Sequence, residues 1–138
     1  MKQHKKIIYT YKGITFEYLI GVSARNNWEI LFEELPDTIC SEERKEWIWF
    51  HVDDLPSAHV VLCLKSEDTK LTWFKKNKDY KHFIKYGAIL CKENSKNSLF
   101  NMNQKVDIIW TQVKNLSKGK ETGSVLIKNY ENLKKIKI

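Results

Sequence analysis

Residues 47–64 read WIWFHVDDLPSAHVVLCL, and this stretch decides the fold. It contains two runs of β-branched and aromatic side chains, Trp47–Val52 and His59–Leu64, which are typical of strands. Strands that are buried on both faces have near-continuous apolar runs. We therefore expect two central strands of a sheet, joined by the polar, proline-containing connection Asp53–Ala58.

Upstream of this stretch, the sequence predicts an N-terminal hairpin. Ile7–Tyr11 and Ile14–Ile20 are rich in β-branched and aromatic residues and flank Lys12-Gly13, a pair that suits a tight turn. In the second run the apolar side chains alternate with Thr15 and Glu17. This alternation indicates a sheet that is covered on one face and partly solvated on the other.

A short amphipathic helix is expected to follow the hairpin. It would begin at Asn26 or Asn27, because asparagine suits the capping position, and end at Leu35, because Pro36 cannot continue it. Its apolar residues recur at helical spacing: Trp28, Leu31, Phe32 and Leu35.

Downstream, residues 71–96 predict a longer, basic helix. One side carries Phe83, Ile84, Gly87, Ala88, Leu90 and Cys91, and most lysines lie elsewhere: Lys75, Lys76, Lys78, Lys81, Lys85 and Lys92. Gly87 and Ala88 would let this helix approach the sheet closely. Three further strands are expected at Val106–Val113, Ser124–Tyr130 and Leu133–Ile138, with a lysine-rich loop over residues 114–123.

These elements predict one α+β domain over residues 1–138, with a mainly antiparallel sheet, an N-terminal hairpin, a short first helix and a longer basic helix packed on the sheet. The chain has 42% hydrophobic and 12% aromatic residues, which supply enough apolar surface for one core and argue against disorder. No internal repeat is evident.

Several classes of protein are disfavoured by composition. No apolar stretch approaches the roughly 20 residues that cross a bilayer, so we expect a cytoplasmic protein without a membrane partner. Cys40, Cys63 and Cys91 are odd in number and widely spaced, so reduced thiols are expected, with no metal and no cofactor. Oligomeric state is not determined by the sequence.

Positive charge is concentrated in the second half of the chain. Residues 1–62 contain 7 Lys/Arg and 10 Asp/Glu, a net charge of −3, and residues 63–138 contain 17 and 7, a net charge of +10. These sum to the overall +7. A localised basic field favours a polyanionic partner, although lysines also keep an aromatic-rich domain soluble.

The stretch over residues 47–62 resembles the signature of the NFACT-R family, W-[LF]-H-x-x-D-x-P-G-S-H-V. Ser57-Ala58 stands where the larger family members have Gly-Ser. Gly21–Asn27 is similar to the family's glycine and asparagine at the head of its first helix. The likeness extends over residues 7–138 and is closest to the short stand-alone eukaryotic members, which usually continue into a coiled coil that is absent from this sequence.

This resemblance implies binding of structured RNA, mainly tRNA and the ribosome, in quality control of stalled translation. The candidate contacts are His51, Asp54 and His59 around the central turn, and Arg25 and Asn27 at the first helix. The candidate phosphate contacts are lysines, whose affinity would fall steeply with salt: Lys75, Lys76, Lys78, Lys81, Lys85, Lys114, Lys118 and Lys120.

Alternatives remain for each group. His51, Asp54 and His59 suit a structural network, an RNA contact, a metal site or an acid–base pair. An RNA-processing or RNA-modifying enzyme is therefore one alternative function, although no further ligand or nucleophile accompanies them. An adaptor for DNA or an acidic protein is another.

The tryptophans divide into two groups. Trp28, Trp49 and Trp110 occupy patterned positions that predict core packing. Trp47 and Trp73 lie nearer the ends of elements and are candidates for stacking on bases.

Overall fold

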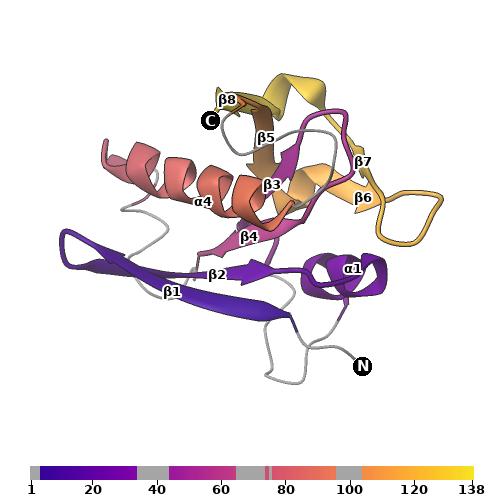
Figure 1. Cartoon of the computed structure of the whole chain (residues 1–138), viewed down its shortest axis with the longest axis horizontal. Helices are drawn as coiled ribbons and strands as arrows, with labels where there is room; N and C mark the ends of the chain where they lie inside the picture. Colours follow the sequence, from indigo (N-terminus) through magenta and orange to yellow (C-terminus); the bar gives the residue numbers. More distant parts are fainter. Residues whose placement is uncertain (1–3, 34–43, 65–73, 75, 96–103) are drawn as a thin grey trace.

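A six-stranded antiparallel sheet forms the centre of the molecule, with strand order β1-β2-β4-β3-β5-β8 (Figure 1). The structure is a computed structural model, and it describes residues 4–33, 44–64, 74, 76–95 and 104–138. The strands of this sheet are β1 Lys5–Tyr11, β2 Ile14–Ile20, β3 Ile48–Val52, β4 Val60–Cys63, β5 Asp107–Gln112 and β8 Lys134–Lys137.

A two-stranded sheet and two α-helices complete the described part of the chain. The small sheet pairs β6 with β7, and two short 3-10 helices, η1 and η2, follow β5 and β7. Their bounds are β6 Leu116–Lys118, β7 Val125–Ile127, α1 Ala24–Phe32, α4 Tyr80–Asn94, η1 Val113–Asn115 and η2 Tyr130–Asn132. The predicted α+β fold, with its N-terminal hairpin and its longer helix on the sheet, is confirmed.

The two strands of residues 47–64 lie in the middle of the sheet, as predicted. β3 pairs with β4 on one side and β5 on the other, and β4 also pairs with β2. Trp49 and Phe50 are 1% and 0% exposed although they point to opposite faces, so β3 is buried on both. The apolar density of this stretch therefore reflects a strand with no solvated face.

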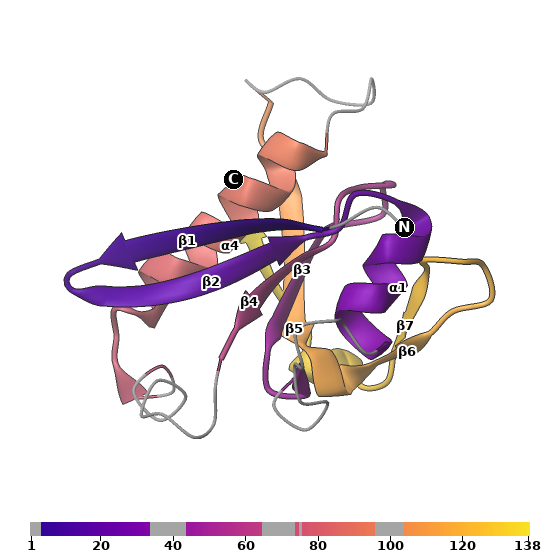
Figure 2. The same cartoon turned by 90° about the horizontal axis from the view of Figure 1, so that it is seen from below.

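Helix α4 crosses one face of the sheet and packs against β3, β4 and β5 (Figure 2). Its closest approach is at Gly87, where an added Cβ would lie 2.4 Å from Cζ of Phe50. The predicted role of Gly87 in close helix packing is confirmed. The hydroxyl of Tyr18 on β2 donates to the carbonyl oxygen of Phe83 at 2.8 Å, which ties the hairpin to the same helix.

Helix α1 begins earlier than the sequence predicted. Ser23 is its capping residue and accepts from the backbone N–H of Asn26 at 3.1 Å, so the capping role expected of Asn26 or Asn27 was wrong. Asn26 instead accepts from the backbone N–H of Val22 and donates to Glu29. The helix ends at Phe32, and the predicted terminus at Leu35 lies outside the described residues.

The lysine-rich segment over residues 114–123 is more ordered than a loop. It contains η1 and β6, and β6 pairs with β7 through Leu116↔Ile127 and Lys118↔Val125. The side chain of Asn115 secures this hairpin, because its amide donates to the carbonyl of Asn129 and accepts from the N–H of the same residue. Leu116 is 3% exposed, so this apolar side chain packs into the core and holds β6 against the body of the protein.

His59 precedes β4 and lies inside the molecule, with 5% of its surface exposed. Trp49 Nε1 donates to its Nδ1 at 3.1 Å, and the ring of His51 packs edge-on against it at 4.7 Å between centroids. Burial, with a smaller contribution from the neighbouring His51, lowers the pKa of His59 to about 3. The imidazole is therefore neutral at pH 7, as its acceptor role requires.

Substitution of Gly87 by alanine tests the close packing of α4. Alanine is favoured over glycine in a helix by about 1 kcal/mol. The added methyl group would meet the buried ring of Phe50, so we expect a net loss of about 1–3 kcal/mol in the free energy of unfolding measured with urea. Lys85→Ala, on the exposed side of the same helix, should change stability little. A Gly87→Ala variant more stable than the wild type would contradict this packing.

Acid should destabilise the fold through His59. Its pKa is about 3 when folded, against an ordinary value of 6.5, so between these values only the unfolded chain binds the proton. The free energy of unfolding should therefore fall as pH drops below about 6.5, by up to about 1.4 kcal/mol per pH unit from this group. Urea unfolding at about pH 7 and about pH 5 measures the slope. His59→Asn should lower stability but flatten this slope, and an unchanged slope would refute the assignment.

Candidate nucleic-acid interface

The exposed side of α4 carries a group of lysines that form no ion pair within the described residues. Lys81 and Lys85 lie one turn apart on the side away from Phe83 and Gly87, and Lys78 lies in the turn before the helix. All three are exposed and form no ion pair with any residue that the structure describes. Lys76 is likewise exposed, whereas Lys75 lies outside the described residues. We call Lys78, Lys81 and Lys85 the helix lysines.

Lys92 differs from the other lysines of this helix. It is 7% exposed, and its ammonium donates to the carbonyl oxygens of Gln104 at 2.7 Å and Ile138 at 3.2 Å. This placement corrects the expectation that Lys92 lies on the polar side of the helix. The ammonium ties α4 to the end of β8 and is not available to a ligand.

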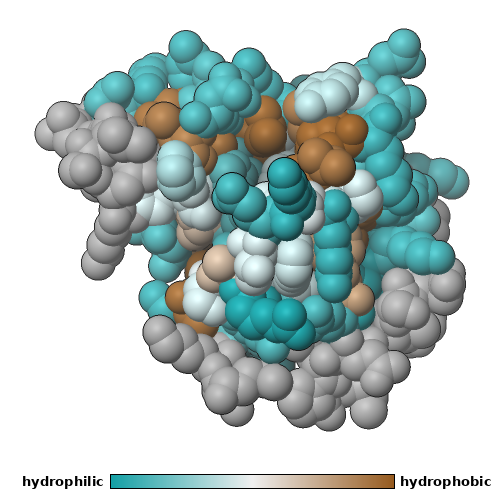
Figure 3. All heavy atoms as spheres, turned by 90° about the vertical axis from the view of Figure 1, so that its right-hand side faces the viewer, coloured by the Kyte–Doolittle hydropathy of each residue, from teal (hydrophilic) through white to brown (hydrophobic). Residues whose placement is uncertain are grey.

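Helix α1 and the β6–β7 hairpin lie on the same side of the molecule (Figure 1), and they carry a second group of basic residues, which includes Arg25 and Lys118. The face on this side of the molecule is mainly hydrophilic, and its apolar patches are separated by polar side chains (Figure 3). The positive charge of the second half of the sequence is therefore divided between two regions of the surface.

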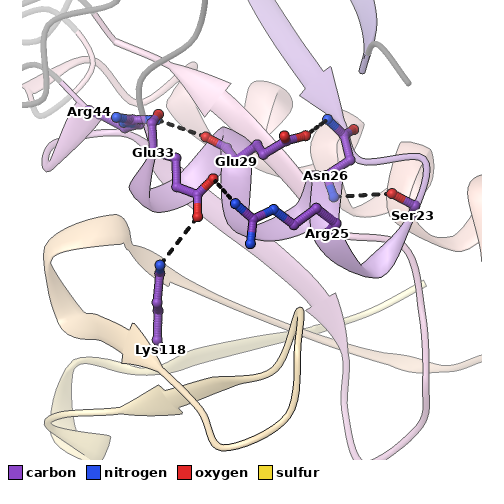
Figure 4. A network of polar contacts seen from close by, with 7 residues as sticks. All are labelled: Ser23, Arg25, Asn26, Glu29, Glu33, Arg44 and Lys118. Carbon is purple, nitrogen blue, oxygen red and sulfur yellow. Dashed lines mark hydrogen bonds and ion pairs between the residues drawn. The ribbon is translucent and has the colours of Figure 1, made fainter. Parts of the chain in front are cut away.

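Two cations of the second group form ion pairs with the same acidic residue. Arg25 and Lys118 both pair with the carboxylate of Glu33, at 3.0 and 3.3 Å (Figure 4). The ammonium of Lys118 also lies 4.9 Å from the ring centroid of Trp28, whose Nε1 donates to the carbonyl of Ser124. Because these cations already have a partner, a phosphate would have to compete with Glu33 for them.

The other candidates of this region are placed as follows. Lys114 pairs with Glu46 at 3.4 Å, and Lys120 is exposed between β6 and β7 without an ion pair among the described residues. The side-chain oxygen of Asn27 is buried and has no hydrogen-bond partner in the described part of the chain. It lies beneath Gly21, where an added Cβ would be 1.9 Å away. The amide oxygen of Asn27 thus faces the protein interior.

The residues of the central turn do not form one exposed group. His59 is buried, His51 is half-buried with its Nδ1 2.6 Å from the carbonyl oxygen of Val52, and Asp54 is exposed in the turn with φ 59°. Burial lowers the pKa of His51 as well. Within the described ranges, no three His, Cys, Asp or Glu side chains converge in a way that could hold a metal ion. Of the four roles considered for His51, Asp54 and His59, this geometry favours a structural network over an RNA contact, a metal site or an acid–base pair.

The tryptophans are only partly placed as predicted: Trp49 lies in the core, whereas Trp28 is half-buried. Trp47, a candidate for stacking, is 2% exposed, and Trp110, expected in the core, is only half-buried. Trp73 lies outside the described residues.

The set of candidate RNA contacts also omitted Lys134 of β8, which is exposed and unpaired within the described chain. The available signal was the high lysine content of the strand predicted at Leu133–Ile138.

Two further expectations concern the cysteines and the membrane. Cys63 and Cys91 are both buried, and burial raises the pKa of Cys91 to about 12. The third cysteine, Cys40, lies outside the described residues. Among the helices that the structure describes, none is both long and apolar enough to cross a bilayer.

Comparison with solved structures identifies a protein of the same fold. The C-terminal part of the fibronectin/fibrinogen-binding protein from Streptococcus suis superposes with a TM-score of 0.66, at 21% sequence identity. The match covers 100% of this chain and 46% of that structure. At this identity the similarity establishes a shared fold.

Comparison of sequences identifies the family. A coiled-coil domain-containing protein 25 homolog from Dictyostelium discoideum is 36% identical over 94 residues. The aligned region is 67% of this chain and 42% of that relative, so the chain spans less than half of the relative's length. Residues 34–129 match the family described as the NFACT protein RNA binding domain. Because this match covers most of the 138 residues, the chain belongs to the NFACT protein RNA binding domain family, and this membership supports an RNA-binding role.

Proposed function

We propose that this domain binds structured RNA of the tRNA or ribosomal RNA class, in translation or ribosome quality control in the cytoplasm, and that the helix lysines supply the main phosphate contacts. Family membership supports RNA as the partner. The observation that carries the assignment to α4 is that Lys78, Lys81 and Lys85 are exposed and unpaired among the described residues.

The contribution of each cation to RNA affinity depends on whether it is already in an ion pair before the RNA binds. An unpaired lysine that meets a phosphate releases condensed counterions, which is the main source of affinity for nucleic acid. Arg25, Lys114 and Lys118 must first give up their contacts with Glu33 or Glu46. We therefore assign the larger contribution to the helix lysines and a smaller one to the region around α1.

The burial of His59 supports binding over catalysis. A general acid or base must come within hydrogen-bonding distance of its substrate and must titrate near the working pH. His59 is 5% exposed, uses its Nδ1 to accept from Trp49, and has a pKa of about 3. These properties suit a fixed acceptor in the core.

Removal of the helix lysines should weaken RNA binding and its dependence on salt. In Lys78→Ala/Lys81→Ala/Lys85→Ala, three phosphate contacts would be lost. The slope of log affinity for tRNA against log salt concentration should then become shallower by about 2–3. Fluorescence anisotropy with labelled tRNA over a range of salt concentrations measures this slope.

A variant with the same loss of charge provides the control. Lys12, Lys135 and Lys137 each pair with an aspartate, so their replacement by alanine should change the slope less. Equal slopes for the two triple variants would refute the assignment to α4. Absence of tRNA binding by the wild type at low salt would refute the RNA proposal, and equal displacement by duplex DNA or an acidic peptide would favour an adaptor instead.

A further inference from the structure

A pocket of about 500 Å³ opens beside the first turn of α4, on the face of the sheet that this helix covers. Its floor is apolar and includes Ile48, Leu64 and Phe74, and Tyr80 of α4 forms part of its wall. The pocket has the size of known small-ligand sites, which bury most of a ligand against apolar and aromatic groups and orient it with a few polar ones.

Trp110 and Lys134 lie side by side in this pocket. They are directly paired across β5 and β8, and both line the cavity. Trp110 is half-buried and Lys134 is exposed, and neither side chain has a hydrogen bond or ion pair within the described residues. Cross-strand partners hold their Cβ atoms about 5 Å apart. An indole face and an ammonium group are thus presented together to a ligand.

The remaining polar groups of the wall differ in their availability. Asn115 is occupied by Thr111 and Asn129, and Gln112 and Lys114 both bond to the carboxylate of Glu46. The side chain of Asn132, which also lines the pocket, makes no hydrogen bond with the described part of the chain. Available groups therefore gather on the β8 side, and the charge of Glu46 disfavours an anion on the opposite side.

We infer that this pocket accepts a single unpaired nucleotide of the bound RNA, with its base stacked on Trp110 and its phosphate near Lys134. The amide of Asn132, which can both donate and accept, suits the polar edge of a base. Aromatic stacking is tolerant of base identity and is worth about 1–3 kcal/mol per base. This inference rests on the proposed RNA-binding function and adds a preference for RNA with an unstacked base.

The pocket is also placed to continue the proposed phosphate surface. Tyr80, which lines it, is next to Lys81 in the sequence and follows Lys78 by two residues. A strand whose phosphates contact the helix lysines therefore passes close to the pocket. A paired stem would supply the phosphates, and one unpaired position would supply the base.

A set of matched RNA duplexes tests the inference. The probes are a blunt RNA duplex, the same duplex with one unpaired 3′ nucleotide, and a third with an abasic nucleotide at that position. The wild type should bind the duplex with the unpaired base about 5- to 100-fold more tightly than the abasic one, as stacking predicts. Trp110→Ala should lose this preference while it retains the affinity for the blunt duplex, and Trp110→Phe should keep part of it.

A charge reversal serves as an independent variant in case Trp110→Ala fails to fold. Lys134→Glu should weaken binding of both extended duplexes more than binding of the blunt one. Lys135→Glu is the matched control, because Lys135 faces the opposite side of β8 and pairs with Asp53. Equal effects of the two reversals, or equal binding of the base-containing and abasic duplexes by the wild type, would overturn the inference. Failure to bind any duplex would instead refute the proposed function itself.

Discussion

The contact between Gly87 of α4 and Phe50 of β3 is the constraint on which the rest of the structure depends. It brings the helix backbone so close to the central strand that a single methyl group would not fit without movement. Because Phe50 is fully buried between the sheet and the helix, one side of α4 is committed to the core. Its position along the sheet is fixed further by the hydrogen bond from Tyr18 to Phe83 and by the buried ammonium of Lys92.

The position of the positive charge on α4 follows from the packing of its other side against the sheet. With Phe83, Gly87 and Cys91 facing the sheet, Lys81 and Lys85 on the other side of the helix face solvent. Lys81 and Lys85 then lie where no carboxylate of the described chain reaches them, whereas Arg25 and Lys118 share Glu33. Net charge along the sequence is therefore a poor measure of available charge, since among the described residues Glu33 and Glu46 pair with cations near α1 and no carboxylate pairs with the helix lysines.

The histidines of the central turn illustrate how a conspicuous pattern can have a structural cause. His59 accepts from Trp49 at the centre of the sheet, and His51 packs against it. Both imidazoles have a lowered pKa because burial disfavours the charged form. Their neutrality keeps an uncompensated charge out of the core and preserves the acceptor that the indole requires.

The sequence by itself determined the strands of residues 47–64, the hairpin and the packing side of α4, because alternation and helical spacing record which side chains leave water. It did not determine the cap of α1, the β6–β7 pairing, the burial of Lys92 or the exposure of Trp110. The cap of α1 is a local choice, since Ser23, Asn26 and Asn27 all have side chains that suit a cap and the structure uses Ser23. The other three features depend on residues more distant in the chain: Asn129 for the hairpin, Gln104 and Ile138 for Lys92, and Lys134 for Trp110. Only the folded chain decides these, because partners far apart in sequence are chosen by packing and not by local propensity.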